Sequence, residues 1–174
     1  MEGLPAGSVF LVDHDDRWRE SFREEAELLR KLLGPKVVAV EHIGSTAVPG
    51  LKAKPLVDLL VGLDDLGEYE RFDFNALAAR GYYRLRNAAV EGKRVIAKFR
   101  QLDPPVKTHV VHVVVHGGDW WQKHLLFRDR LRENPEIAGD YERLKLGLAE
   151  RHPGDERAYA DAKLEFVERV LSEK

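Results

Sequence analysis

Residues 41–58 hold most of the side chains in this sequence that could do chemistry. A predicted strand ends at Ile43, and Gly44, Ser45 and Thr46 follow it directly. Glycine lets a backbone approach a ligand closely, while serine and threonine offer hydroxyl groups beside backbone N–H groups. If a helical turn begins there, its N-terminus is a favourable site for a phosphate group. The residue types therefore predict phosphate binding directly after this strand.

Asp58 stands inside the apolar run Leu56–Leu63, which predicts a buried strand that carries one acid. A carboxylate in such surroundings is costly unless it is hydrogen-bonded, paired with a cation or bound to a metal ion. Lys54 lies close by in the sequence and could neutralise either Asp58 or a bound phosphate. We therefore expect both residues to line a site, with Asp58 as its acid.

His112 lies on a predicted strand over residues 107–116 and offers further chemistry. If this strand lies beside that of Asp58, then Asp58, His112 and His42 would form a mixed nitrogen and oxygen metal site. Such a donor set suits Zn, Mn or Fe better than Mg. The expected cofactor is therefore a divalent ion, with Mg, Mn and Zn as the candidates. Alternatively, His112 is a general base, because imidazole titrates near neutral pH.

The elements that must position these residues follow from hydrophobic periodicity and from turn residues. Apolar residues at helical spacing predict a helix over residues 18–33, which Gly34-Pro35 ends. Strands are predicted at residues 9–12, 37–43, 56–63, 82–87, 95–102 and 107–116, and a second helix at 66–80. From Asp119 onward the chain is predicted to be helical, with breaks near Pro135 and Pro153. This order of elements indicates an α/β or α+β fold with a single sheet.

The composition is typical of one globular domain, expected over residues 1–174. Cysteine is absent, which excludes disulfides, thiolate metal sites and cysteine nucleophiles and fits a reducing cytoplasm. The net charge is −2, so the basic excess of most nucleic-acid binders is missing. No apolar run approaches the ~20 residues of a membrane span, and no signal peptide is evident. A cytoplasmic location is therefore expected, with neither a membrane nor a nucleic acid as partner.

Several longer stretches resemble a known family. The sequences EHIGSTAVPGL at residues 41–51 and KPLVD at residues 54–58 resemble motifs of the GrpB family. THVVHVV at 108–114 and HLLFRDRLR at 124–132 are similar to its histidine-rich strand and to one of its C-terminal helices. The resemblance covers nearly the whole chain. It implies a nucleotidyltransferase-like fold, as in DNA polymerase β, with a small mixed sheet, an N-terminal helix and a helical C-terminal third.

The resemblance also bears on the residues that would hold a substrate. Those expected to contact substrate or phosphate are Gly44, Ser45, Thr46, Lys54, Arg128 and Lys163. Arg128 and Lys163 fall on predicted C-terminal helices, where charged side chains usually form a solvated face. For these two residues the resemblance favours the alternative, in which they point inward and hold phosphate. The expected ligand is a nucleotide or another phosphorylated small molecule.

The catalytic pattern of the nucleotidyltransferase superfamily is incomplete here. Residues 43–45 match its hydrophobic-Gly-Ser part, and Asp58 follows after a spacer of twelve residues. Nucleotidyl transfer commonly uses two divalent ions held by two or three carboxylates. The second acid should share a strand face with Asp58, two residues later, but that position is Leu60. The predicted strands at 95–102 and 107–116 contain no acid either.

The sequence therefore leaves two functions open. In the first, the protein is an enzyme that transfers a nucleotidyl group to an unidentified acceptor. Asp58 and His112 are then catalytic, and Asp58, His112 and His42 hold the metal ion. In the second, it is a degenerate transferase that binds a nucleotide or phosphometabolite without turnover, or that assists a protein partner such as an enzyme of coenzyme A metabolism. Leu60 favours the second function and the implied fold favours the first.

Overall fold

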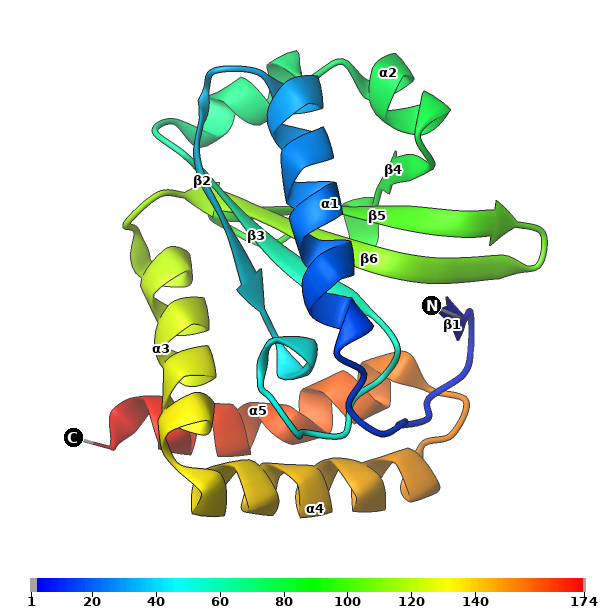
Figure 1. The fold of residues 1–174 in the computed structure, drawn as a ribbon, viewed down its shortest axis with the longest axis vertical. Coiled ribbons are helices and arrows are strands. Elements are labelled where there is room, and N and C mark those ends of the chain that lie inside the picture. Colours follow the sequence, from blue (N-terminus) through cyan, green and yellow to red (C-terminus); the bar gives the residue numbers. More distant parts are fainter. Residues whose placement is uncertain (1–2, 174) are drawn as a thin grey trace.

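Six strands form one mixed sheet in the structure, a computed structural model that describes residues 3–173 (Figure 1). The strands are β1 (Leu4–Pro5), β2 (Val37–Ile43), β3 (Val57–Leu63), β4 (Tyr82–Arg84), β5 (Lys93–Leu102) and β6 (Pro105–Val115). Their order is β2-β3-β6-β5-β4, and β1 pairs with β6 beside this path. Strands β3 and β6 are parallel, while the other described pairs are antiparallel. The strand of Asp58 therefore lies directly beside the strand of His112.

Helix α1 (Arg17–Leu33) crosses one face of the sheet (Figure 1). Its buried apolar residues recur at helical spacing and are Trp18, Ala26, Leu29 and Leu33. This stripe packs against strand residues such as Leu59 and Val111 in the main hydrophobic cluster. The helix ends at Gly34, whose φ of 79° few other residues adopt without strain. The predicted N-terminal helix is thus confirmed.

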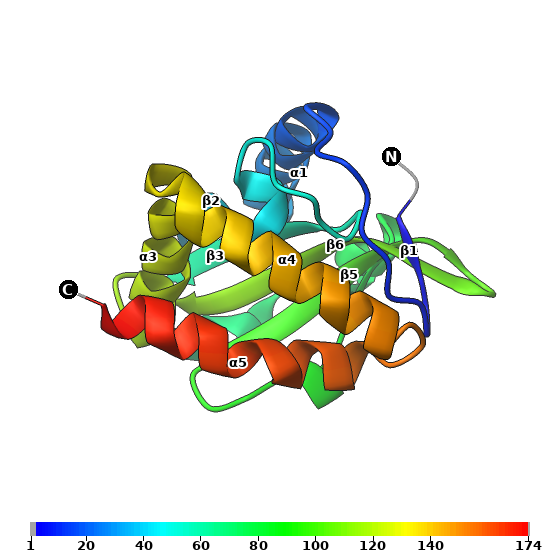
Figure 2. The ribbon, with the colours of Figure 1, turned by 90° about the horizontal axis from the view of Figure 1, so that it is seen from below.

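Three helices form the C-terminal third: α3 (Asp119–Glu133), α4 (Pro135–Arg151) and α5 (Glu156–Ser172). The Asn134 side chain accepts hydrogen bonds from two backbone N–H groups of α4, and Pro135 fits the first helical position. The Asp155 side chain caps α5 in the same way. Figure 2 shows α4 and α5 side by side beneath the end of the sheet, close to where β2 ends and β3 begins.

The loop between β2 and β3 packs onto these C-terminal helices. It starts with a 3-10 turn, η1 (Ser45–Ala47). Val48 and Leu51 of the loop are buried in one cluster with Tyr141 and Phe166 of the helices. Burial of these apolar side chains brings the helices close to the turn, which is the arrangement that creates the candidate site.

The predicted fold class is confirmed: a small mixed sheet, an N-terminal helix and a helical C-terminal third. The predicted strand at residues 9–12 is wrong. Val9 donates its backbone N–H to the carbonyl of Pro153, whereas Val12 forms an isolated bridge with Ala53. Because the segment contacts two different parts of the chain in turn, it forms no continuous ladder.

The predicted helix at residues 66–80 is divided in two. A 3-10 helix, η2 (Leu66–Arg71), precedes α2 (Phe74–Ala79). The Asp73 side chain accepts the backbone N–H of Ala76 and so starts a new helix in the middle of the predicted one. The predicted strand at 82–87 is also shorter than expected, because η3 (Arg86–Ala88) follows β4. Within residues 3–173, no helix has both the length and the apolar character needed to cross a membrane.

Candidate functional site

A cavity of about 170 Å³ lies where the turn after β2, the start of β3 and helices α4 and α5 meet. We call it the lysine cavity, since three lysines from separate segments contribute to its wall. Its lining consists of Gly44, Ser45, Thr46, Ala53, Lys54, Leu56, Asp58, Tyr141, Lys145, Tyr159 and Lys163. The structure thus brings five of the six predicted phosphate-binding residues together around Asp58.

Gly44 explains how the turn comes so close to the acid. Its φ is 73° and its ψ is −174°, a backbone conformation that is essentially restricted to glycine. A Cβ atom at this position would lie 2.7 Å from Oδ2 of Asp58. Only a residue without a side chain can therefore follow β2 here, and it places Ser45 beside Asp58 at the cavity.

Lys145 is the most buried of the three lysines, with 1% of its surface exposed. Its Nζ donates hydrogen bonds to Oγ of Ser45 at 2.8 Å and to the backbone carbonyl of Lys52 at 2.6 Å. Lys54 and Lys163 are half-buried, and both lie over the ring of Tyr159, at 5.1 and 4.5 Å from its centroid. Lys54 thus reaches the cavity from the loop before β3, Lys145 from α4 and Lys163 from α5.

Little negative charge lies near these lysines to compensate their positive charge. Within the described part of the chain none of the three forms an ion pair, and Asp58, the single acid of the lining, is paired with His112 instead. Burial and the neighbouring ammonium groups lower the pKa of Lys145 to about 7 and that of Lys54 to about 8. Burial lowers the pKa of Lys163 to about 8, against the opposing charge of Asp58. An anion in the cavity would relieve this repulsion.

Asp58 and His112 are in contact, as expected from a parallel pairing of their strands. Nε2 of His112 lies 3.1 Å from Oδ1 of Asp58. Burial alone would raise the pKa of Asp58, but the hydrogen bond from His112 and the charges of Lys54 and Lys163 outweigh it and hold that pKa below its usual value. His112 is not part of the cavity lining, so it supports Asp58 from behind.

His42 belongs to the opposite face of the sheet. In the antiparallel pairing of β2 and β3, Ile43 is opposite Asp58 and His42 is opposite Leu59. His42 stacks on Phe22 of α1, and its Nε2 lies 2.9 Å from Oγ1 of Thr46. Burial lowers the pKa of His42 to about 4. The structure therefore does not bring His42 together with Asp58 and His112 as a metal site.

A buried leucine occupies the position at which the second acid is missing. Leu60 lies on the same face as Asp58, is completely buried, and packs with Ile43, Val114 and Trp121. Within residues 3–173, no three His, Asp or Glu side chains are grouped closely enough to hold a metal ion. The donor set at Asp58, one carboxylate and one imidazole facing lysines, does not fit a two-metal centre.

Arg128 lies outside the lysine cavity. Its guanidinium Nη1 donates to Glu41 at 2.8 Å and to the backbone carbonyl of His42 at 3.0 Å, on the α1 side of the loop. Lys163, by contrast, points inward as expected. The structure therefore places Lys163 in the cavity and Arg128 in a neighbouring groove, although both were predicted to hold phosphate.

Lys145 is a helix residue for which the sequence left both a solvated and an inward position open, and it is not among the residues predicted to hold phosphate, although a signal is present. Tyr141, Lys145 and Leu148 are spaced by four and three residues and form the buried stripe of α4. Tyr159, Lys163 and Phe166 repeat the pattern on α5. A lysine in the middle of an apolar helical stripe is a candidate for an inward-facing cation, because helix geometry gives it no direct route to solvent.

The fold and the cavity together define a small α/β protein with a lysine-lined cavity at one end of a mixed sheet. Comparison with known families is more specific: the GrpB model, described as GrpB protein, matches residues 8–173. The chain therefore belongs to the GrpB family. It is 43% identical over 173 residues to the glutamate-rich protein GrpB of Alkalihalophilus pseudofirmus, an alignment that covers 99% of both chains.

Two further similarities concern a solved structure and a longer protein. The crystal structure of conserved protein GrpB from Enterococcus faecalis matches with a TM-score of 0.79 and 33% identity, over 93% of this chain and 97% of that chain. A dephospho-CoA kinase of Mycolicibacterium paratuberculosis is 27% identical over 176 residues, which span 89% of this chain but 43% of that protein. A sequence similar to this chain thus also occurs as one part of a longer protein.

Proposed function

We propose that this protein binds the phosphate groups of a nucleotide or another phosphorylated metabolite in the lysine cavity. The observation that carries the proposal is the meeting of one buried and two half-buried lysines at the turn of Ser45, none of which forms an ion pair within the described residues. Keeping three positive charges together in a partly buried site is costly, and Asp58 is the single acid of the lining, so an anion among the lysines would stabilise the fold. The hydroxyl and backbone N–H groups of the 3-10 turn add neutral donors.

The size of the cavity limits what enters it. Pockets for whole drug-sized ligands measure roughly 300–1,000 Å³, whereas the lysine cavity measures about 170 Å³. It therefore accommodates one or two phosphate groups, and the remainder of the ligand lies outside. Coenzyme A precursors belong among the candidate ligands, because the chain is similar to a part of a dephospho-CoA kinase.

Binding is expected to be independent of divalent metal ions. The three lysines supply the positive charge that metal ions provide in two-metal transferases, and Leu60 occupies the place of a second carboxylate. The expected result is therefore the same affinity with Mg²⁺, Mn²⁺ or Zn²⁺ as with EDTA.

Isothermal titration calorimetry tests this function with ATP, GTP, CTP, UTP, coenzyme A and inorganic pyrophosphate, each with a metal ion or with EDTA. Lys145→Met should weaken binding of the best ligand about 10- to 100-fold, the effect of losing one hydrogen bond between charged groups. The exposed Lys36→Met is the matched control and should bind like the wild type. Equal affinities of the wild type and Lys145→Met, or no binding of any ligand, would refute the proposal.

Nucleotidyl transfer is a second candidate, favoured by one observation: the carboxylate of Asp58 lies directly against the Gly44 turn. The test is release of pyrophosphate from each nucleoside triphosphate, with the wild type and Asp58→Asn compared. Turnover that disappears in a folded Asp58→Asn variant would establish an enzyme. Ligand binding without any pyrophosphate release would leave phosphate binding as the function.

A further inference from the structure

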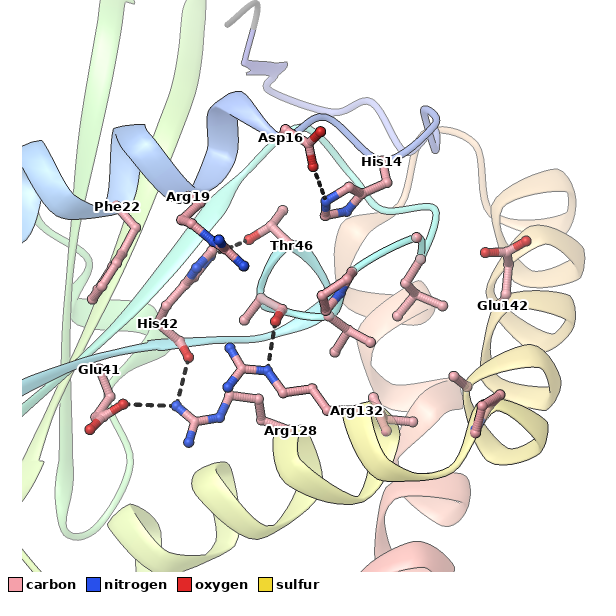
Figure 3. Close-up of a pocket in the computed structure, with 18 of the residues that line it drawn as sticks. His14, Asp16, Arg19, Phe22, Glu41, His42, Thr46, Arg128, Arg132 and Glu142 are labelled. Atoms are coloured by element: carbon pink, nitrogen blue, oxygen red, sulfur yellow. Dashed lines mark hydrogen bonds and ion pairs between the residues drawn. The ribbon is translucent and has the colours of Figure 1, made fainter.

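A second and larger hollow lies on the other side of the turn after β2 (Figure 3). It measures about 810 Å³, within the roughly 300–1,000 Å³ of small-molecule sites. Helix α1, the loop over residues 46–51, and helices α3 and α4 form its walls. We call it the arginine groove. Thr46 lines both this groove and the lysine cavity, so the two lie back to back.

Four arginines line the groove, two from α1 and two from α3: Arg19, Arg23, Arg128 and Arg132. Each pair is four residues apart, which places both members on one face of their helix. Arg128 is already engaged by Glu41 and Asp129, and Arg23 lies 3.6 Å from Glu20. The remaining two arginines decide the character of the groove.

Arg19 and Arg132 enter the groove from opposite walls, as Figure 3 shows. Within residues 3–173 neither forms an ion pair. Arg132 donates from Nε to the carbonyl of Ala47 at 2.8 Å, which fixes its guanidinium beside the turn and leaves its terminal nitrogens available. Burial and the nearby charge of Arg128 lower the pKa of Arg132, so its charge is poorly compensated. Two guanidinium groups that form no ion pair within the described residues suit a dianion better than a monoanion.

Phe22 and His42 make part of the lining of the groove apolar and aromatic. The rings of Phe22 and His42 stack at a centroid distance of 4.9 Å and an interplanar angle of 9°. His42 is held by its contact with Thr46, and the low pKa caused by its burial keeps it uncharged at neutral pH. An apolar ring of a ligand can pack against this aromatic pair while its charged end reaches the arginines.

The acids of the groove argue against a nucleic acid as occupant. Asp16, Glu41 and Glu142 are also among the lining residues, and they would repel an extended chain of phosphates. The net charge of −2 provides no wider basic surface to compensate for them. A small molecule with a single phosphate group meets fewer of these acids than an extended chain of phosphates does.

We propose that the arginine groove is a second ligand site, which binds a small molecule carrying a phosphate group and a flat apolar part, separately from the phosphate held in the lysine cavity. Arg19 and Arg132 bind the phosphate, and the stacked Phe22 and His42 rings support the flat part. The two sites would thus hold two different molecules on the two sides of one turn.

Phenyl phosphate is the probe, and NMR of the arginine Nε–Hε signals is the measurement. The signals of Arg19 and Arg132 should move on titration, and Arg132→Gln should weaken binding about tenfold, or ~1.4 kcal/mol. Arg19→Gln is a second test that does not disturb the turn, because the Arg19 side chain is exposed and holds no loop carbonyl. It should weaken binding by a similar factor. Arg157→Gln, at a distant exposed position on α5, is the control and should leave binding unchanged.

Two further comparisons separate the groove from the lysine cavity. Lys145→Met should leave the phenyl phosphate response of Arg19 and Arg132 intact, even if the lysine cavity binds nothing. If Lys145→Met abolishes that response, one ligand spans both hollows and the second site is refuted. Benzoate binding as tightly as phenyl phosphate would refute the phosphate specificity, and no movement of either arginine signal would refute the groove altogether.

Discussion

The lysine cavity and the arginine groove lie on two sides of one turn, yet they hold positive charge in different ways. The cavity is small and its Lys145 is 1% exposed, without an acid partner. The groove is wide, and Arg128 is balanced by Glu41. Burial therefore lowers the pKa values of the lysines toward neutral pH, to about 7 for Lys145, whereas guanidinium groups remain charged at that pH. The two regions should respond differently to pH, to mutation and to anions.

The largest expected effect concerns the turn that separates the two regions. Gly44→Ala should destabilise the protein by about 3 kcal/mol or more, because a Cβ would meet Oδ2 of Asp58 and the backbone is strained as well. Gly50→Ala is the matched control: its φ is 79°, but a Cβ there meets nothing within 4 Å. Urea unfolding of both variants separates backbone strain from the clash, and equal losses would show that the contact with Asp58 is unimportant.

The next effect is a gain in stability. A lysine whose pKa is lower in the folded protein binds its proton more weakly there, so burial destabilises the fold fully below about pH 7. The cost falls as pH rises from the folded pKa of about 7 to the usual lysine pKa of 10.5. Lys145→Met should therefore raise the free energy of unfolding by about 1–3 kcal/mol near pH 6, with a smaller gain near pH 10.

Urea unfolding at both pH values measures this difference, with Lys36→Met as the control for loss of an exposed lysine. A loss of stability at low pH in Lys145→Met would mean that the lysine is a structural part of the cavity. That result would remove the main argument for an anion site.

Sulfate binding sharpens the comparison of the two regions. Sulfate keeps both charges over this pH range, so a change in affinity reports the protein. Because Lys54, Lys145 and Lys163 lose protons at about pH 7 to 8, affinity for the cavity should fall about tenfold or more between about pH 6 and about pH 9. In Lys145→Met, any sulfate that still binds does so in the arginine groove, and its affinity should not change between these two pH values. Calorimetry in matched buffers measures the affinity at each pH for both proteins.

The smallest effect concerns the support of Asp58. His112→Leu removes the hydrogen bond that lowers the pKa of Asp58, while burial continues to raise it. The pKa of Asp58 should therefore rise, and a carboxyl ¹³C NMR titration measures the change. His116→Leu, on an exposed histidine of the next turn, should leave it unchanged. An unchanged pKa in His112→Leu would show that the lysines alone hold Asp58 ionised.

The sequence predicted the elements well where one local pattern dominates. The apolar stripe of α1 and its end at Gly34 need no information from the rest of the chain, and β2 has the bounds expected of it. The sequence could state the contact of Asp58 with His112 only as a conditional expectation, and in the structure the two side chains lie 3.1 Å apart. That expectation depended on pairing two strands that are far apart in the sequence, and the parallel register of β3 and β6 provides it.

The remaining parts of the site depend on tertiary arrangement. His42 and Ile43 alternate along β2, and only the register with β3 determines that Ile43, rather than His42, shares the face of Asp58. Lys145 reaches Ser45 across 100 positions of sequence because the apolar loop packs onto α4. Local patterns could mark Lys145 as inward-facing, but they contain no information on what it faces.

The short turn at Thr46 has a thermodynamic consequence. Thr46 belongs to the wall of both hollows, and its hydroxyl contacts His42 on the groove side while its neighbour Ser45 holds Lys145 on the cavity side. A ligand that draws this turn toward one side changes the shape of the other. Linkage then requires reciprocity: whatever factor one occupant imposes on the affinity of the second, the second imposes on the first. The turn can therefore couple the binding of two ligands that do not contact each other.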